Sequence, residues 1–430
     1  MNCSKRSIYS DRQRAIVSYS ILCIVVAFAG CSTPVFAQES GTTLEAAIAL
    51  ALERNPSIQV STLETTRQET LNRASIDIPK TEVSLLYGQY NSIEKRDNNI
   101  TVSQSIPFPS VFSRQLSLNR AMTEASRYRE NISRNDLVFS VREVFNQLLY
   151  LKARHRILQQ QDSLLGDLAK VAALHYKTGE GTLLAKTSAE TQWHELQNQY
   201  SRNEADIHIA LNRLQLLCQA PAITAIAGDL ETSFTALSLD SVSVEQNPSL
   251  LYTRQQIEVA QLQKKLETAR ALPELRLGYF NQTLIGLQTV QGQEQYFGPS
   301  KRFQGFQAGI AIPLWYAPHA SRIRAASLAT DVARKQEETY ILALTQQYNQ
   351  AYQELQKNRN SLEYYRSSAL KTADLLTHQS RVAFKSGELD YATLLLNLRQ
   401  ALSIHEGYLS ALQQYNQSII FIHYLNGNKP

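Results

Sequence analysis

The chain has 430 residues, with 43 Lys and Arg against 38 Asp and Glu, so its formal charge is +5. An apolar content of 43% and this low net charge exclude a disordered chain. Four cysteines cannot supply a disulfide scaffold for this length. The 16 glycines, about 4% of residues against a typical ~7%, favour long uninterrupted helices.

The N-terminus has the order of an export signal. Four basic residues among the first 14 positions precede an apolar stretch over 21–30, and small residues follow. The apolar stretch is about ten residues long, which is too short to cross a bilayer as a helix. The pattern therefore predicts a secretory signal peptide.

Two processing sites for this signal remain open. Val35-Phe36-Ala37 fits the small-x-small rule, and cleavage there removes a signal peptide of residues 1–37. Phe28-Ala29-Gly30-Cys31 resembles a lipoprotein box, which would make 1–30 the signal and leave Cys31 acylated. Cleavage after Ala37 leaves 39 basic against 37 acidic residues. The basic excess therefore belongs largely to the signal and indicates no acidic partner.

After the signal, the chain repeats itself once. Glu53-Arg54-Asn55-Pro56-Ser57 returns 192 positions later as 245–249, and Lys177-Thr178-Gly179-Glu180 returns 208 positions later as 385–388. The change in spacing places a longer loop in the second half. A period of roughly 200 residues is not that of a solenoid. We therefore expect two similar repeats, 38–218 and 247–430, with a polar mid-height connection at 219–246.

The first repeat is expected to run helix, strand pair, very long helix, shorter helix. Asn55-Pro56 supplies an N-cap with proline at the first helical position. Two alternating segments follow, at about 82–90 and 99–106. From Pro109 to Lys177 helix formers dominate, and apolar residues recur at seven-residue spacing. At 1.5 Å per residue, this helix would be roughly 100 Å long.

The second repeat follows the same order. Strands are expected at about 274–282 and 303–312, and a long helix over about 318–385. The return helices of the two repeats are expected at 183–218 and 390–425, about half as long as their partners. The leading helix of each repeat is expected to stack on a return helix and make up the length.

This arrangement limits how the strands can lie in a membrane. Each has about 8–11 residues, the length of a tilted transmembrane strand. Four strands cannot close a barrel, and open edges are not tolerated in lipid. Single-chain barrels begin at about eight strands, so a barrel needs several copies, and three would enclose an open lumen. The alternative is a soluble sheet packed on a helical bundle, but helices of roughly 100 Å favour the barrel.

The signal, the paired Asn-Pro-Ser motifs, the strand pairs closing on Ile-Pro and the matching Lys-[Thr/Ser]-Gly-Glu turns resemble the TolC family of outer-membrane efflux proteins, over about 40–425. The resemblance implies a mainly α fold with a β-barrel contribution: a duplicated protomer of long coiled-coil helices plus four transmembrane β-strands. It also implies a homotrimer that completes a twelve-stranded barrel and a helical tunnel. The location would be the cell outer membrane, with a periplasmic extension.

The same resemblance implies function and partners. The protein would be the exit duct of a tripartite efflux system within outer-membrane lipid. It would passively conduct substrate from a periplasmic adaptor (membrane fusion) protein and an inner-membrane efflux pump to the exterior. The runs at 87–91 and 105–109 look most like the heavy-metal cation branch, of cobalt–zinc–cadmium or copper–silver type. Heavy-metal cations are therefore the expected substrate.

The hairpin tips are the docking points that the resemblance implies for the adaptor. The tip residues are Lys177, Thr178, Gly179 and Glu180 in the first repeat, and Lys385, Ser386, Gly387 and Glu388 in the second. Helix capping by the glycines and lysines is the purely structural alternative. Glu180, Glu388 and Asp390 are expected at the periplasmic aperture, where acidic groups repeated around an axis favour cations.

No enzymatic motif is found in the sequence. It contains no Gly-x-Ser-x-Gly, no phosphate-binding loop and no Cys-x-x-Cys, and its eight histidines are scattered. We therefore expect no catalytic residue, no metal site, no cofactor and no nucleic-acid partner. Trp315, Tyr316 and Phe108 follow strand ends and are either membrane-interface aromatics or turn-packing residues.

Two functions from other classes compete with an exit duct. One is a soluble periplasmic coiled-coil adaptor or scaffold without a pore, although adaptors usually carry a single helical hairpin. The other is an extracellular fibrous adhesin, although the heptads end at each tip. A trimer in the outer membrane would favour the duct, and a soluble periplasmic monomer would refute it.

Overall fold

The computed structural model describes residues 41–89, 94–231, 234 and 244–427. The predicted signal peptide and Cys31 lie outside these residues, as does part of the predicted connection. From Thr42 onward the chain forms one unit.

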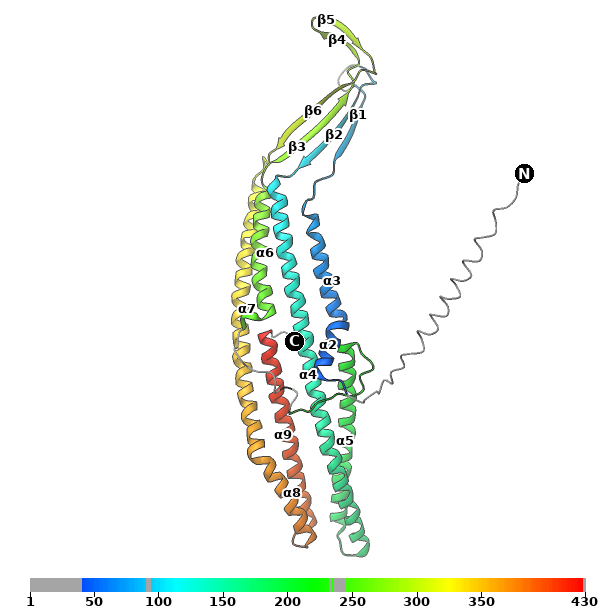
Figure 1. Ribbon diagram of the computed structural model, residues 1–430, viewed down its shortest axis with the longest axis vertical. Coiled ribbons are helices and arrows are strands. Elements are labelled where there is room, and N and C mark those ends of the chain that lie inside the picture. The colour runs from blue at the N-terminus through cyan, green and yellow to red at the C-terminus, as the bar shows by residue number, and fades with distance from the viewer. Residues whose placement is uncertain (1–40, 90–93, 232–233, 235–243, 428–430) are drawn as a thin grey trace, which may run out of the picture. The chain divides into compact units, whose positions relative to one another are not determined.

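Long helices make up most of this unit, and the strands gather at one end of them (Figure 1). The described α-helices are α2 (Leu44–Arg54), α3 (Pro56–Leu71), α4 (Pro109–Thr178), α5 (Leu183–Cys218), α6 (Pro248–Arg270), α7 (Ala317–Tyr364), α8 (Leu370–Lys385) and α9 (Tyr391–Asn426). The described strands are β1 (Glu82–Tyr87), β2 (Asn98–Ile106), β3 (Glu274–Gln282), β4 (Gly286–Val290), β5 (Gln293–Phe297) and β6 (Phe303–Ala311). Of the predicted fold class, the mainly α chain with long helices and some sheet is confirmed, and closure of a barrel by three copies stays a prediction.

The first helical hairpin matches its prediction closely. α4 is one continuous helix of 70 residues, about 105 Å at 1.5 Å per residue. Gly179 ends it with φ at 81°, in the left-handed region that glycine adopts without strain. α5 then returns alongside α4 for 36 residues. Side chains at the predicted seven-residue spacing are buried in α4: Leu137, Val144, Leu151 and Leu158.

The second long helix differs from its prediction, because it is not one continuous α-helix. α7 ends at Tyr364, and a π-helical turn over Tyr365–Ala369 separates it from α8. The Tyr365 side chain lies against Gly407 of α9, where a β-carbon would overlap the tyrosine hydroxyl. A tertiary contact therefore accompanies the interruption. No glycine or proline between 319 and 385 signals it in the sequence.

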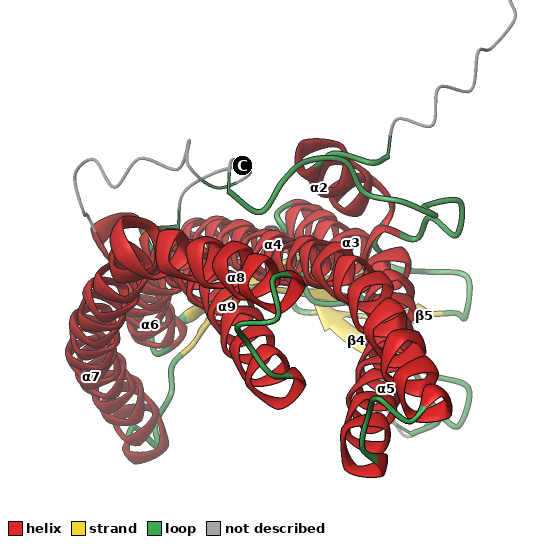
Figure 2. Cartoon of the chain, turned by 90° about the horizontal axis from the view of Figure 1, so that it is seen from below, coloured by secondary structure: helices red, strands yellow, loops and turns green. Residues whose placement is uncertain are grey.

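Seen along the helices (Figure 2), α7 and α5 lie at opposite edges of the helical layer, with α9 and α4 between them. α4 packs against both α5 and α9, and α9 packs against α7. The two hairpins are therefore neighbours through α4 and α9.

The four long strands form one antiparallel sheet in the order β1-β2-β3-β6, so the strand pairs of the two repeats lie side by side. The outer edges of β1 and β6 have no partner strand in the described part of the chain. β1 ends at Tyr87, short of the predicted 90. The longer loop of the second repeat forms an additional hairpin, β4–β5, which the sequence analysis did not predict.

Two asparagine side chains join helices end to end. Asn55 caps α3 by accepting the Ser57 N–H at 2.9 Å, while its Nδ2 donates to the Leu217 carbonyl near the end of α5, also at 2.9 Å. Asn247 caps α6 in the same way and donates to the Leu425 carbonyl of α9 at 2.8 Å. The expected stacking of leading on return helices is confirmed, because α3 continues α5 and α6 continues α9 (Figure 1).

The connection between the repeats is more deeply packed than predicted. Leu230 and Phe234 are buried in the mid-height core with side chains of α4, α5 and α9. Lys152 of α4 donates to the Ile226 carbonyl at 3.0 Å. Thr42 forms a parallel bridge with Ile226, which ties the start of the described chain to the same place.

Candidate functional site

One face of the four-stranded sheet is mostly apolar, although nothing in the described chain covers it; its polar positions are Asn98, Gln104, Asn281 and Gln304. The register places Val83, Val102, Tyr279 and Phe306 in one row across the four strands. Neighbouring positions on this face add Leu85, Ile100, Leu275, Leu277, Ala308 and Ile310. Phe306 is 89% exposed. An exposed apolar face of this extent marks a contact with membrane or protein.

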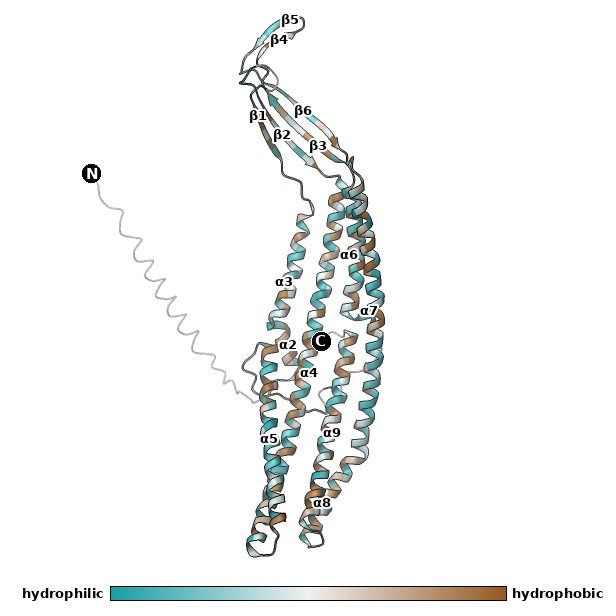
Figure 3. Ribbon diagram, turned by 180° about the vertical axis from the view of Figure 1, so that it is seen from behind, coloured by the Kyte–Doolittle hydropathy of each residue, from teal (hydrophilic) through white to brown (hydrophobic). Residues whose placement is uncertain are grey.

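The opposite face of the same sheet is mostly polar or small, with Leu86, Phe280 and Phe303 as the exceptions among its described positions. One of its rows runs Glu82, Ser103, Gly278 and Gln307. Polar and apolar residues thus alternate along the strands, as the colours of Figure 3 show. A sheet with one apolar and one polar face can separate lipid from water.

Exposed aromatic side chains follow the ends of β2 and β6. Trp315 is 84% exposed, and Leu314, Tyr316 and Phe108 are also exposed. Turn-packing residues would be buried, so the exposure favours the alternative in which these side chains lie at a membrane–water interface. They mark the level at which the sheet meets the helices.

The first hairpin tip is held by hydrogen bonds to the last turn of α4. The His175 carbonyl accepts from the Glu180 and Gly181 N–H groups, at 2.9 and 3.0 Å. The Thr178 hydroxyl donates to the same carbonyl at 3.1 Å. The Glu180 carboxylate lies 3.4 Å from Nδ1 of His175. Lys177 makes no hydrogen bond or ion pair with a described residue.

The second tip repeats this geometry. Gly387 has φ at 80°, and the Glu388 N–H donates to the Ala383 carbonyl at 2.9 Å. The Ser386 hydroxyl donates to that carbonyl as well, at 3.1 Å. Lys385 and Glu388 are exposed, and neither pairs with a side chain of the described residues. The glycine turns predicted for both tips are therefore present, whereas neither Lys177 nor Lys385 hydrogen-bonds a helix-end carbonyl among the described residues.

Asp390 begins α9 as its N-cap. One carboxylate oxygen accepts the Thr393 N–H at 3.1 Å. Hydrogen bonds from Thr393 hold the pKa of Asp390 below its usual value. The group therefore stays ionised at any pH near neutrality.

The two tips of one chain enclose a groove of about 660 Å³. Glu180 and Asp390 both line it, from opposite hairpins, whereas Glu388 is not among the lining residues. Phe384 and Tyr391 supply apolar walls, and burial raises the pKa of Tyr391 to about 12. The structure thus brings together two of the three predicted aperture acids.

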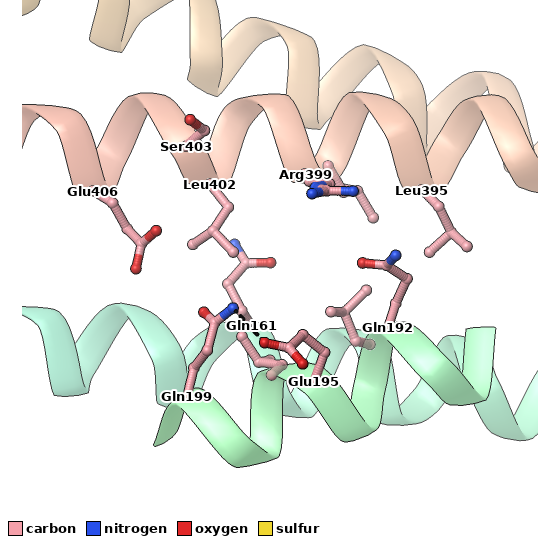
Figure 4. A pocket seen from close by; sticks show the side chains of 12 residues that line it. Gln161, Gln192, Glu195, Gln199, Leu395, Arg399, Leu402, Ser403 and Glu406 are labelled. Atoms are coloured by element: carbon pink, nitrogen blue, oxygen red, sulfur yellow. Dashed lines mark hydrogen bonds between the residues drawn. The ribbon is translucent and has the colours of Figure 1, made fainter. Parts of the chain in front are cut away.

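A second groove, of about 310 Å³, lies between α5 and α9, further from the tips (Figure 4). Leu395 and Leu402 point into it from α9, and Gln192 lies opposite on α5. Gln199 donates to the Glu195 carboxylate across one turn of α5, at 3.3 Å. Leucines and amides line the groove together with the charged side chains of Glu195, Arg399 and Glu406.

Polar links between the hairpins were not predicted. Arg154 of α4 pairs with Glu406 of α9 at 3.0 Å. Tyr408, two residues on, donates its hydroxyl to Glu231 of the connection. The partners are 252 and 177 residues apart in the sequence, so no local pattern could have signalled them.

Within the described residues, no helix combines the length and hydropathy of a membrane span. Nor do three or more His, Cys, Asp or Glu side chains in that part of the chain meet closely enough to hold a metal ion.

Several solved structures that are similar to this chain are described as outer-membrane channels. The chain is similar to the outer-membrane channel OprN, with a TM-score of 0.75 and 16% identity over 89% of each chain. It is similar to CusC, a protein that forms a transmembrane channel, with a TM-score of 0.74 and 15% identity over 90% of this chain and 92% of that one. It is also similar to the CmeC outer membrane channel of Campylobacter jejuni, with a TM-score of 0.71 and 13% identity over 89% of this chain and 85% of that one. No curated protein matches by sequence.

The fold is therefore that of the outer-membrane efflux channels. Within this class, residues 45–218 match the family described as outer membrane efflux protein. The matched segment contains α2 to α5 and both strands of the first repeat.

Proposed function

We propose that three copies of this chain form a passive exit duct in the outer membrane, as part of a tripartite efflux system. One observation carries the proposal: a sheet with an exposed apolar face, a polar face and two open edges is joined to hairpins about 105 Å long.

The open edges require further copies. In lipid each unpaired strand edge would leave backbone N–H and C=O groups without partners, at several kcal/mol per group. Pairing β1 of one copy with β6 of the next removes both edges. Three copies of the four-stranded sheet close a twelve-stranded barrel, whose lumen is wide enough for water.

The two faces of the sheet then acquire separate roles. Phe306 and Ile310 face the lipid tails, and the row through Ser103 and Gln307 lines the lumen. The long helices continue this lumen into the periplasm.

The exposed apolar face also argues against the soluble adaptor. A soluble protein would leave Val83, Leu85, Phe306 and Ile310 in water, each at least 65% exposed. Burying a side chain of this kind stabilises by about 1.5–3 kcal/mol. The hypothesis of a fibrous adhesin does not explain why the sheet has one apolar and one polar face.

The assembly can be tested by outer-membrane extraction followed by native mass measurement. We expect a particle of three chains that resists SDS at room temperature. Replacing Phe306 and Ile310 with Arg should prevent membrane insertion, since Arg on a lipid-facing strand costs about 2–4 kcal/mol near the bilayer centre. The matched control, Gln307→Arg on the other face, should still insert. A soluble monomer of the natural chain would contradict the proposal.

The partners belong to the same proposal. An adaptor would dock at the tips, where Gly179 and Gly387 form the turns and the groove between Phe384 and Tyr391 offers apolar surface. The substrate we propose is heavy-metal cations, on the resemblance of the runs at 87–91 and 105–109. The similarity in fold to outer-membrane channels supports the exit duct, but it does not support the heavy-metal branch in particular.

The acidic aperture gives a prediction about ion selectivity. Glu388→Gln with Asp390→Asn should lower the preference of the reconstituted pore for cations, because six carboxylates leave the mouth of a trimer. Asn caps a helix about as well as Asp, so α9 should remain intact. The measurement is the reversal potential in a salt gradient. An unchanged potential would contradict a role for these acids.

A further inference from the structure

The polar face of the sheet carries all of its charge at one end. Among its described positions only Glu82, Glu274 and Arg276 are charged. The remaining polar-face positions are Ser84, Leu86, Asn99, Thr101, Ser103, Ser105, Gly278, Phe280, Gln282, Phe303, Gly305, Gln307, Gly309 and Ala311. The apolar face has no charged residue.

The three charges lie at successive levels along the sheet. Glu274 begins β3, and Arg276 follows two residues later on the same face. Glu82 begins β1 at the level of Gly278, because both face Ser103. At about 3.3 Å per residue, the levels are roughly 7 Å apart. The charges therefore occupy the half of the sheet that adjoins the helices, in the order negative, positive, negative.

Arg276 is open to solvent on this face. It is exposed, and it forms no hydrogen bond or ion pair with any residue that the structure describes. Its cross-strand neighbours are Ser105 and Gly309. A β-carbon at Gly309 would have no atom within 4 Å, so no side chain covers the guanidinium from that strand.

The two carboxylates are exposed as well. Glu274 accepts a hydrogen bond from the Ser105 hydroxyl at 2.9 Å, which orients it without neutralising it. Glu82 makes no hydrogen bond or ion pair within the described chain. All three charged side chains are therefore exposed on the polar face of the sheet.

We propose that Glu82, Glu274 and Arg276 form a charged ring that selects ions at the periplasmic end of the strand conduit, separately from the hairpin tips. The inference rests on the proposed duct of three copies. Such a duct places six carboxylates and three guanidiniums around one lumen. Rings of fixed charge set the sign of the ions that pass, and their field extends about one Debye length, ~8–10 Å, into the lumen.

The carboxylates and the guanidinium groups of the ring have opposite effects on ion selectivity. The carboxylates are in excess and favour cations. Arg276 is the one positive group of the polar face among described residues, so it weakens this preference and lets anions approach. Arg276 is thus the residue that limits how strongly the conduit prefers cations.

The test is the reversal potential of the purified channel in a planar bilayer under a KCl gradient. Arg276→Gln should raise the permeability ratio of K⁺ to Cl⁻ by a few-fold, and Arg276→Lys should leave it near that of the natural chain. Glu82→Gln with Glu274→Gln should lower the ratio. The matched control is Glu294→Gln, an exposed carboxylate on the β4–β5 hairpin that lies off the sheet, which should change nothing.

The outcomes separate the ring from the duct. If the variants conduct and their reversal potentials equal that of the natural chain, the ring is overturned while the duct stands. If only tip substitutions shift the potential, selection lies at the tips and the ring is again overturned. If the natural chain forms no conducting pore, the proposed function is contradicted, and so is the charged ring that rests on it.

Discussion

Asn55 and Asn247 show how much one side chain can do in this fold. At the start of a helix, the side-chain oxygen of Asn55 accepts one N–H group and that of Asn247 accepts two. Each side-chain nitrogen donates to a carbonyl at the end of another helix. The carbonyls, of Leu217 and Leu425, belong to last turns that lack partners within their own helices. The N-cap role could be predicted from Asn-Pro alone. The cross-helix bond could not, because it joins residues 162 and 178 positions apart.

Asn247→Asp separates the two roles of this side chain. Aspartate still accepts the Ser249 and Leu250 N–H groups and the Tyr340 hydroxyl, but a carboxylate then faces the buried Leu425 carbonyl. We expect the free energy of unfolding to fall by about 1–3 kcal/mol, the cost of an unsatisfied buried polar group. Chemical denaturation of the purified chain measures it.

Thr182→Asp is the control for this experiment. Thr182 also caps a helix, accepting the Ala185 N–H at 3.1 Å, but it makes no bond to another helix. Its replacement should change the stability by less than about 0.5 kcal/mol. Equal stability of the natural chain and the Asn247→Asp variant would show that the cross-helix bond contributes nothing.

At the scale of elements, the long helices and their tips could be predicted, because helix formers, heptads and turn glycines are local signals. The π turn at Tyr365–Ala369 could not. It coincides with a contact between Tyr365 and Gly407, which are 42 positions apart. In the sequence, the β4–β5 hairpin is indicated only by the longer spacing between repeated motifs, which predicts a longer loop and not its strands. The faces of the sheet were predictable, but the grouping of Glu82 with Arg276 depends on the strand order.

Gly407 should be required for the packing of the π turn. Gly407→Ala adds a β-carbon that overlaps the Tyr365 hydroxyl. Overpacking of this kind costs about 1–3 kcal/mol, which exceeds the ~1 kcal/mol that alanine adds to helix stability over glycine. We therefore expect a lower free energy of unfolding for the variant.

The double variant makes this prediction specific. Tyr365→Phe removes the hydroxyl that meets the new methyl group, and that hydroxyl has no hydrogen bond to a described residue. Gly407→Ala combined with Tyr365→Phe should therefore recover part of the lost stability, because the ring carbons Cζ and Cε1 remain 2.8 and 3.0 Å from the added β-carbon. Tyr365→Phe alone should be nearly neutral. Additive effects in this cycle would contradict the contact as the cause of the loss.

At the scale of the whole molecule, the described start of the chain lies far from the sheet. Thr42 exchanges two backbone hydrogen bonds of 3.0 Å with the segment around Ile226, and the Ile226 carbonyl accepts from Lys152. Lys152 lies 43 residues into α4 from Pro109, which follows the sheet. At 1.5 Å per residue this is about 65 Å, shortened by at most ~6 Å for the reach of the lysine side chain.

This distance bears on the two processing sites. Cys31 precedes Thr42 by 11 residues, and even a fully extended segment of that length spans at most about 40 Å. An acyl chain on Cys31 would therefore fall roughly 20 Å short of a membrane that contains the sheet. We infer that cleavage follows Ala37, so that the mature chain begins at Gln38 and the strands alone hold it in the membrane.

Intact mass and N-terminal sequencing of the purified protein test this inference. We expect a mature chain that begins at Gln38, and Cys31→Ser should leave its mass and its outer-membrane location unchanged. Ala37→Phe should block processing, because a bulky residue does not fit the small-x-small rule. A mature chain that begins with a lipid-modified Cys31 would contradict the inference. Thr42 would then have to leave Ile226 for the lipid to reach the bilayer, and hydrogen exchange at the Thr42 and Ala227 amides would detect that release.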